Sequence, residues 1–491
     1  MATEPDREMR RRALGDLREY IRIAEEIGAL EVVRGADPDL ELGALYELSL
    51  EHDYPPLLLF EDIKGCDPRF RVVTNVRSSR VMVGSLGMDS VIALRKGNRR
   101  EKKSIPPKFV NSGPVFENVL KGDDVDVLAF PAPRWHENDG GAYIGTECIV
   151  ITKDPDSDWV NVGTYRVQVQ DEKTVSVFIE PGKHGDMIRR KYWARGQHCP
   201  MVVCLGQAPV LGAAGRVVTP QGVSDFALAG GRIDEAIELV NGPITGIPMP
   251  VAAELVFEGH MPPPEEETRP EGPFGEWPGY YASETRDEPV LRVEAIYHRD
   301  DPIVVGNPPE KPTYPGRQTN FGNAAALWDA LEAAGVPEVK GVWKVFGGGN
   351  RFINVIAIDQ QFAGHAKMAG LVAAGCPAGA YMNRMTIIVD DDIDITSTAE
   401  VMWALATRWD PATQTDIVDG GWTGHIDPVL SPEKRESGDI TSSRIIITAV
   451  RPFHWRDRFP KVNALDPAYA EEVRRKWAGK LAFLKAPPPR R

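Results

Sequence analysis

Two glutamates that bracket a short turn are the residues of this chain best suited to acid–base chemistry. Glu271 and Glu276 flank the sequence Gly-Pro-Phe-Gly, which cannot continue a regular helix or strand and can bend both carboxylates toward one cavity. If an arginine pairs with one carboxylate, that group stays ionised, whereas a less solvated partner can hold a proton near neutral pH. The motif therefore fits an acid–base pair. A solvent-exposed acidic turn is the more common use of such a motif and remains the alternative.

A second group of residues suits a divalent cation. Asn161 precedes Arg166 on a predicted strand and its approach, and His184 ends the motif EPGKH, which leads into a predicted helix. With an acidic residue, an amide oxygen and an imidazole suit a cation that accepts mixed ligands, such as manganese. Asp225, in the sequence GVSDF, is the candidate third ligand, and a helix N-cap is its alternative role. Lys183 and Arg166 add positive charge, which suits a phosphorylated cofactor bridged by the metal.

These residues fall in a region that is predicted to be rich in strands. From about residue 143 to 307, runs of Val and Ile are punctuated by turn residues. Only two helices are predicted within it, near 185–195 and 224–240. A strand-dominated region of this length is typical of an antiparallel barrel or sandwich.

The flanking regions show helical periodicity. An amphipathic helix is predicted over 14–28, and a linker over 308–319. After the linker, helices alternate with strands, which indicates a parallel or mixed sheet. The predicted helices there cover 323–335, 364–374, 397–407 and about 467–485, the last packing on the body or on a neighbouring subunit. We therefore predict a three-part α/β protein: an N-terminal α/β domain (1–125), a β-rich domain (126–312) and a C-terminal α/β domain (313–491).

Composition excludes several classes of protein. The 491 residues carry 57 Lys and Arg against 71 Asp and Glu, and this net charge of −14 argues against a non-specific nucleic-acid or anionic-membrane binder. The five cysteines are scattered without a CxxC, so neither a disulfide framework nor a zinc ribbon is supported. No signal-peptide pattern and no long apolar run occur, so we expect a cytoplasmic protein. The GK[ST], HExxH and GxSxG signatures are absent as well.

The ordered motifs resemble those of the UbiD-like decarboxylases, which use prenylated flavin mononucleotide (prenylated FMN). The resemblance covers nearly the whole chain and extends to spacing, with eighteen residues from Arg166 to His184 and five from Glu271 to Glu276. The motifs that carry it are DLREYIRIAEEIGAL, NVGTYRVQVQ, EPGKH, VSDFALAG, AAELVFEG, EGPFGE and IIVDDDIDITSTAEVMWALATR. The fold that the resemblance implies has a central split β-barrel-like flavin-binding domain between two α/β domains.

The resemblance also implies roles for individual residues. Arg166, Glu271 and Glu276 match the family's catalytic set, in which Glu276 is the proton donor and Glu271 pairs with Arg166 beside the flavin. Two further matches, Asn161 and His184, are ligands of the metal that holds the flavin phosphate. That metal is Mn²⁺ or another divalent cation, with K⁺ as a further candidate.

Other positions surround the cofactor in the same comparison. Lys183 and Thr164 match positions that line it. Asp225 stands where the family usually has Glu, and its side chain is one methylene shorter, which puts metal distance or affinity in question. Walls of the substrate site are expected from the segments that contain Arg317 and His425. Assembly as a homodimer or larger oligomer, and supply of the cofactor by a flavin prenyltransferase, complete the set of expected partners.

The reaction implied is the non-oxidative, reversible decarboxylation of an aromatic, heteroaromatic or α,β-unsaturated carboxylic acid. Loss of CO₂ from an sp² carbon leaves a carbanion that no amino-acid side chain can delocalise, so a cofactor must carry that step. Two alternatives stay open: a metal-dependent hydrolase built on Asn161, His184 and Asp225, and a non-catalytic flavin-binding protein.

Overall fold

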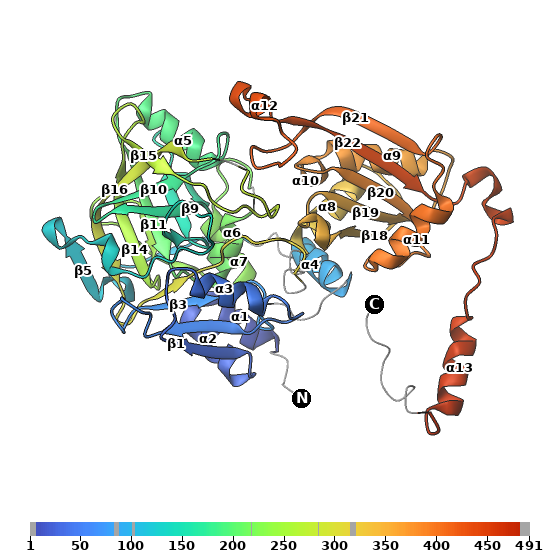
Figure 1. The fold of residues 1–491 in the computed structure, drawn as a ribbon, viewed down its shortest axis with the longest axis horizontal. Coiled ribbons are helices and arrows are strands. Elements are labelled where there is room, and N and C mark those ends of the chain that lie inside the picture. The colour runs from blue at the N-terminus through green and yellow to red at the C-terminus, as the bar shows by residue number, and fades with distance from the viewer. Residues whose placement is uncertain are drawn as a thin grey trace. The chain divides into compact units, whose positions relative to one another are not determined.

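The structure is a computed structural model that describes residues 6–82, 88–100, 104–217, 219–282, 284–314 and 321–481. Its chain divides into two compact units (Figure 1). Unit 1 comprises residues 1–321, 346–349 and 424–439, and unit 2 comprises 322–345, 350–423 and 440–491. The structure describes the predicted linker (308–319) only as far as residue 314, so Arg317 lies outside the described residues.

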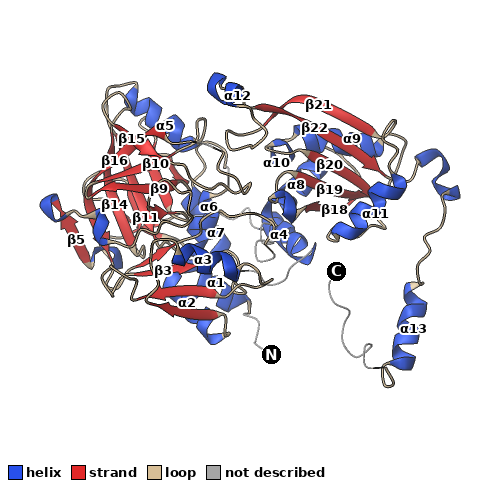
Figure 2. Cartoon of the chain, in the orientation of Figure 1, coloured by secondary structure: helices blue, strands red, loops and turns tan. Residues whose placement is uncertain are grey.

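A large antiparallel sheet forms the centre of unit 1 (Figure 2, red). Along its path, the strands described follow the order β6-β9-β10-β16-β14-β11-β7-β8, with β5 and β15 also paired to β16. The strands are β5 (Asn118–Lys121), β6 (Tyr143–Gly145), β7 (Ile149–Lys153), β8 (Val160–Gly163), β9 (Arg166–Asp171), β10 (Thr174–Phe178), β11 (Cys199–Leu205), β14 (Leu255–Met261), β15 (Thr268–Glu271) and β16 (Arg286–His298).

This sheet curls on itself. Strands β9 and β8 lie six steps apart along the path, which in a flat sheet would separate them by roughly 29 Å. Only two residues, 164 and 165, connect β8 to β9, and three consecutive Cα steps reach at most about 11 Å. The ends of the sheet must therefore approach each other, which confirms the predicted barrel-like central domain and brings Asn161 and Arg166 to one edge of it.

Both faces of the curled sheet are buried. On β11, Met201, Val203 and Leu205 belong to the core enclosed by the sheet, whereas Val202 and Cys204 belong to a second core on the other face. Successive side chains of a strand point to opposite faces, so a strand covered on both sides reads as a continuous apolar run. This explains the sequence MVVCL, which shows no polar alternation.

The helices of this region differ in part from those predicted. Helix α5 (His184–Trp193) agrees with the predicted 185–195. Helix α7 (Asp225–Ile233) is shorter than the predicted 224–240, because Asp234 takes a left-handed conformation (φ 55°) and the chain then enters strand β12 (Glu238–Asn241). The short apolar helix α6 (Pro209–Gly215) was not predicted. A small sheet, β13 (Pro248–Pro250), β12 and β4 (Lys108–Phe109), completes this part.

The first hundred residues add a further layer to unit 1. The prediction of one continuous helix over 14–28 is wrong, because the chain forms two helices that meet at Asp16. Asp16 is extended (φ −149°) and caps α2 by accepting a hydrogen bond from Glu19 N. They are followed by α3 and α4 and by the sheet β1-β2-β3-β17. The bounds are α1 (Arg7–Gly15), α2 (Leu17–Glu26), α3 (Glu41–Ser49), α4 (Met88–Arg100), β1 (Leu30–Arg34), β2 (Leu57–Glu61), β3 (Arg71–Thr74) and β17 (Ile303–Val305).

Unit 2 is built on a mixed sheet, as its sequence pattern predicts. Among the described residues the order is β18-β19-β20-β22-β21, with β19, β20 and β22 parallel and the two edge strands antiparallel. The last helix, α13 (Pro467–Trp477), ends earlier than the predicted 485. The other elements are β18 (Val339–Lys344), β19 (Ile353–Ile358), β20 (Met385–Asp390), β21 (Thr415–Trp422), β22 (Thr441–Ala449), α8 (Gly322–Ala333), α9 (His365–Gly375), α10 (Pro377–Ala380), α11 (Thr398–Arg408) and, within unit 1, α12 (Pro432–Ser437). None of the described helices has the length and apolar character needed to span a bilayer.

Candidate active site

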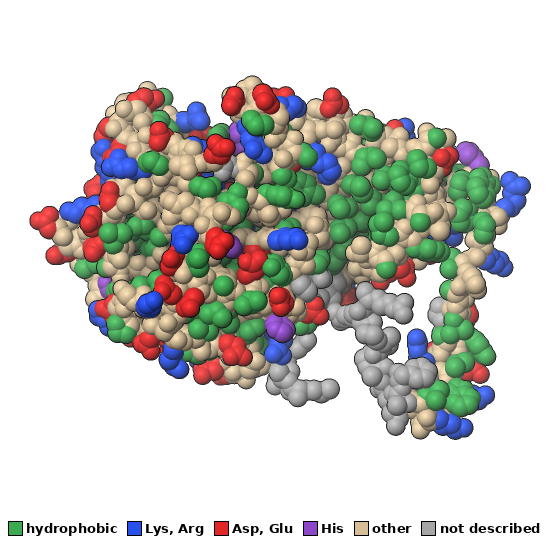
Figure 3. All heavy atoms as spheres, in the orientation of Figure 1, with side chains coloured by type: hydrophobic (Ala, Val, Ile, Leu, Met, Phe, Trp, Pro, Cys, Tyr) green, Lys and Arg blue, Asp and Glu red, His purple; other side chains and the backbone are tan. Residues whose placement is uncertain are grey.

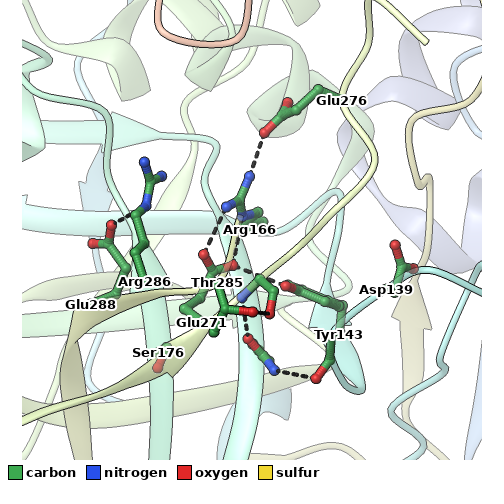
Figure 4. A network of polar contacts seen from close by, with 12 residues as sticks. Asp139, Tyr143, Arg166, Ser176, Glu271, Glu276, Thr285, Arg286 and Glu288 are labelled. Atoms are coloured by element: carbon green, nitrogen blue, oxygen red, sulfur yellow. Dashed lines mark hydrogen bonds and ion pairs between the residues drawn. The ribbon is translucent and has the colours of Figure 1, made fainter. Parts of the chain in front are cut away.

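Arg166, the first residue of β9, binds two glutamates at once. Its Nε and Nη2 donate to the two carboxylate oxygens of Glu271, each at a distance of 2.7 Å, and its Nη1 donates to Glu276 Oε1. Figure 4 shows Arg166 between the two carboxylates. The side chains of Arg166 and Glu271 are 6% and 0% exposed. The fold thus brings together three residues that the sequence suggested as one group, although 105 positions separate Arg166 from Glu271.

Glu276 is largely buried, and 12% of its side-chain surface remains exposed to solvent. Removal from water raises the pKa of Glu276 to about 7; the charge of Arg166 opposes this increase, and the charges of Glu180 and Glu271 add to it. A carboxyl group with a pKa near neutrality is present in both forms at pH 7 and can transfer a proton in either direction. Glu276 therefore has the property that an acid–base group needs.

The turn between the two glutamates is braced by its neighbours. Gly272 has φ +85°, a left-handed conformation that favours glycine, and the Gly272–Pro273 peptide bond is cis. The Gly272 amide donates to Gln168 Oε1 at 3.1 Å, and Thr285 Oγ1 donates to the Gly272 carbonyl at 3.0 Å. Since Glu271 is fully buried and Glu276 nearly so, the alternative of a solvent-exposed acidic turn is wrong.

Aromatic side chains that the sequence analysis did not identify fix Arg166 in place. The guanidinium carbon lies 4.2 Å from the ring centre of Phe178 and 5.3 Å from that of Phe274. Phe178 is the cross-strand partner of Arg166 in the β9–β10 pair. Tyr143, on β6, donates to Glu271 Oε1 at 3.0 Å. These contacts depend on how distant strands pair, which no local sequence motif indicates.

A further carboxylate, Glu180, acts on Glu276. Its Oε1 lies 3.9 Å from His425 Nδ1, and His425 belongs to the segment 424–439 of unit 1. Burial alone raises the pKa of Glu180, but the neighbouring His425 and the charge of Lys183 outweigh it and hold the pKa below its ordinary value. Of the two residues expected at the walls of a substrate site, His425 thus contacts a group whose charge is felt by Glu276.

The three candidate metal ligands lie around strand β8. Asn161 is buried on β8, and Asp225 Oδ2 accepts from the amide of the next residue, Val162, at 3.1 Å. His184 begins α5, which contacts the same strand, and the charge of Asp225 acts on its imidazole. Trp159, just before β8, packs edge-on against the His184 ring with 4.9 Å between ring centres.

This group fits a divalent cation held by mixed ligands. Asn161, 4% exposed, supplies an amide oxygen, a neutral ligand that such a cation accepts beside an imidazole and a carboxylate. Burial lowers the pKa of His184, which favours the neutral imidazole that metal binding requires. Among the described residues no three His, Cys, Asp or Glu side chains form a metal cluster, and this group holds two side chains of these types, His184 and Asp225, together with Asn161. Thr164, half-buried after β8, and Lys183, at the N-cap of α5, lie on the same connections.

The alternative role of Asp225 as a helix N-cap is wrong. Ser224 occupies the N-cap of α7, and its side chain accepts from Ala227 N. Asp225 is instead the first helical residue, 2% exposed, and its second oxygen accepts from the Thr219 hydroxyl at 3.0 Å. The two hydrogen bonds orient the carboxylate and leave further lone pairs free for a cation.

Comparison with known families gives a match over most of the chain. The model of the 3-octaprenyl-4-hydroxybenzoate carboxy-lyase (UbiD) Rift-related domain matches residues 108–312. Those of the N-terminal and C-terminal domains of the same enzymes match residues 21–97 and 319–449.

Individual relatives agree with these matches. The pyrrole-2-carboxylic acid decarboxylase of Pseudomonas aeruginosa is 31% identical over 95% of this chain and 97% of its own length. The UbiD-class enzyme HmfF of Pelotomaculum thermopropionicum, solved with FMN, is 28% identical with a TM-score of 0.79, covering 95% of this chain and all of the other. An evolved dimeric form of HmfF, solved with prFMN, is 27% identical with a TM-score of 0.75 over 93% and 98% of the two chains.

Proposed function

The chain belongs to the UbiD family of carboxy-lyases, and from this premise we propose that it decarboxylates an aromatic or heteroaromatic acid with prenylated FMN as cofactor. The observation that carries the proposal is the Arg166 side chain that binds both Glu271 and Glu276. An aliphatic α,β-unsaturated acid is the second candidate for the substrate. Pyrrole-2-carboxylate, named for the Pseudomonas aeruginosa relative, is the first acid to test.

Glu276 is the group proposed to move the proton. When bound, prenylated FMN supplies the electron sink that the carbon losing CO₂ requires. That carbon must then receive a proton, and a carboxyl group with a pKa of about 7 is protonated often enough at neutral pH to give one. In the reverse direction, carboxylation, the same group would take the proton from that carbon.

Arg166 and Glu271 are proposed to orient this acid and the cofactor beside it. The bidentate pair between them is buried and charge-assisted, so the guanidinium keeps one orientation while its Nη1 faces Glu276. Tyr143 and Phe178 restrict the pair from two further sides. An Arg166 side chain held in one orientation therefore fixes the position of the Glu276 carboxylate.

A divalent cation, for which Mn²⁺ is our first choice, is proposed to be held by Asn161, His184 and Asp225. The cation would neutralise the phosphate of the cofactor, and Lys183 would add a further positive charge. Support comes from the Asp225 carboxylate, which two hydrogen bonds orient, and from the buried Asn161 on β8. Thr164 is proposed to line the cofactor.

Assembly with a second copy is proposed through the surface of unit 2. Figure 3 shows hydrophobic side chains gathered over this unit. Its exposed large apolar side chains include Leu371, Met402, Trp403, Ile417 and Trp422. We expect a homodimer or a larger homo-oligomer. Light scattering coupled to size-exclusion chromatography measures the molar mass of the assembly directly. A flavin prenyltransferase is the partner proposed to supply the cofactor.

The experiment that tests the reaction class is mass spectrometry of the small molecule bound to protein co-expressed with a flavin prenyltransferase. Prenylated FMN, together with CO₂ release from a panel of aromatic and unsaturated acids, is the expected result. Folded, metal-loaded protein with no flavin would contradict the proposal. A hydrolase on the Asn161 cluster predicts metal without flavin, and a non-catalytic binder predicts flavin without CO₂ release.

A further inference from the structure

We propose that Asp139 is a positioning residue for Glu276, because it holds the turn that carries Glu276 from both sides. This inference rests on the proposed function of Glu276 and adds a residue that acts through it. Asp139 lies before β6, far from the EGPFGE motif in the sequence, and its side chain is completely buried. Figure 4 shows it beyond Tyr143, on that side of the network.

One oxygen of Asp139 binds both ends of the turn. Asp139 Oδ1 accepts from the Gly275 amide at 3.4 Å and from the Tyr281 hydroxyl at 3.0 Å. Gly275 and Tyr281 flank the short bridge in which Glu276 N donates to Tyr280 O at 3.1 Å. A single carboxylate oxygen therefore binds the backbone just before Glu276 and the side chain of Tyr281, which follows the bridge.

The segment that carries Asp139 is itself fixed against the same turn. Asp139 Oδ2 accepts from the His136 amide at 3.0 Å, and the Gly140 amide donates to the Pro273 carbonyl at 2.7 Å. A Cβ at Gly140 would lie 1.9 Å from the Gly272 carbonyl oxygen, so only glycine permits this approach. The two loops are in backbone contact, and a shift of one moves the other.

The imidazole of His136 lies between Asp139 and Glu47. Its Nδ1 lies 3.7 Å from Asp139 Oδ2, and its Nε2 lies 3.8 Å from Glu47 Oε2. Burial lowers the pKa of His136, but Asp139, Glu47 and Glu310 together raise it above its ordinary value. Although acidic groups gather here, no metal cluster of three His, Cys, Asp or Glu exists among the described residues, so we assign the group to positioning.

Loss of this clamp has two consequences for Glu276. A freer turn spends less time with Glu276 in the productive position, which lowers kcat more than it raises KM. A freer turn also admits water, and better solvation moves the pKa of Glu276 down toward its ordinary value. The other charged groups that act on Glu276, namely Arg166, Glu271, Glu180 and Arg286, are not substituted in these variants.

The test is hydrogen–deuterium exchange of residues 272–282 in the cofactor-free protein, which requires no assumption about the reaction. We compare the wild type with Asp139→Ala, Asp139→Asn and Tyr281→Phe. The matched control is Tyr20→Phe, which removes a buried tyrosine hydroxyl that donates to Val76 O in another part of unit 1. We expect exchange in 272–282 to accelerate about tenfold in Asp139→Ala and severalfold in Tyr281→Phe, with partial recovery in Asp139→Asn. Unchanged exchange in Tyr281→Phe and Asp139→Asn would overturn the inference, even if Asp139→Ala failed to fold.

Kinetics of the cofactor-loaded variants separate this inference from the proposed function. We expect Tyr281→Phe to lower kcat severalfold with KM within about twofold, and to shift the alkaline limb of the kcat profile to lower pH. An unshifted profile with wild-type kcat would contradict the positioning role. If Glu276→Gln instead retained wild-type turnover, the proposed function would fail, and the exchange experiment would still decide whether Asp139 holds the turn.

Discussion

Arg166 and Glu271 form a bidentate ion pair inside the protein, with both hydrogen bonds 2.7 Å long and neither side chain more than 6% exposed. A pair of this kind is costly to break, because removal of one partner leaves the other charge buried and unpaired. Here the same guanidinium also binds Glu276, so its loss affects two carboxylates.

Replacement of Arg166 by Ala is therefore expected to abolish turnover and to lower the free energy of unfolding by about 3–5 kcal/mol. Metal content should stay at the wild-type level, because Arg166 is not a proposed ligand. Urea unfolding, elemental analysis and CO₂ release measure the three effects. Arg69→Ala, which breaks an exposed pair with Asp67, is the control and should change none of them. Retained decarboxylation in Arg166→Ala would contradict the role given to this residue.

The raised pKa of Glu276 makes stability depend on pH. The pKa is about 7 in the folded protein against an ordinary value of 4.5, so the folded state binds the proton more tightly. The free energy of unfolding then falls as pH rises from about 4.5 to about 7. Glu276→Gln mimics the neutral acid, so the variant should be more stable than the wild type at pH 8 by up to about 3 kcal/mol, with the difference vanishing near pH 4.5.

Urea denaturation of the cofactor-free protein at several pH values checks this prediction. Glu265→Gln, a substitution of an exposed glutamate on the connection between β14 and β15, should follow the wild type at every pH. A Glu276→Gln effect of equal size at pH 5 and pH 8 would mean that Glu276 is ionised throughout this range.

Asp225 and Ser224 are neighbours with separable roles. Asp225→Ala should remove most of the bound manganese, because Val162 and Thr219 orient the carboxylate next to β8, which carries the buried Asn161. Ser224→Ala should cost about 1 kcal/mol of stability through the lost cap and keep the metal. Elemental analysis of the two proteins decides. Full manganese occupancy in Asp225→Ala would show that this carboxylate serves only the local fold.

The sequence was sufficient for those features that local patterns determine. The strands of unit 1 and the alternation of unit 2 follow from Val and Ile runs and from helical periodicity. The predicted helix boundaries were wrong where a single residue sets the boundary. Asp16 caps the start of α2, and Asp234 ends α7. The apolar helix α6 is too short to show a period.

The site was predictable only in part, for the same reason. Glu271 and Glu276 are close in sequence, so their turn was visible, and the motif resemblance added Arg166. Tyr143, Phe178 and Asp139 reach the site through strand pairing and the curl of the sheet, which no short window of sequence contains. Asp139 lies in the sequence NDGG, which indicates a turn and nothing more.

The most direct test of the proton-donor role compares wild type with Glu276→Gln, both loaded with prenylated FMN, in D₂O. CO₂ release from pyrrole-2-carboxylate, or from the best acid of the panel, is measured together with deuterium at the carbon that carried the carboxylate. If Glu276 is the proton donor, we expect CO₂ and a deuterated product from the wild type, and a rate at least about 100-fold lower from Glu276→Gln with cofactor content unchanged. Equal rates of CO₂ release and deuterium incorporation in the two proteins would contradict it.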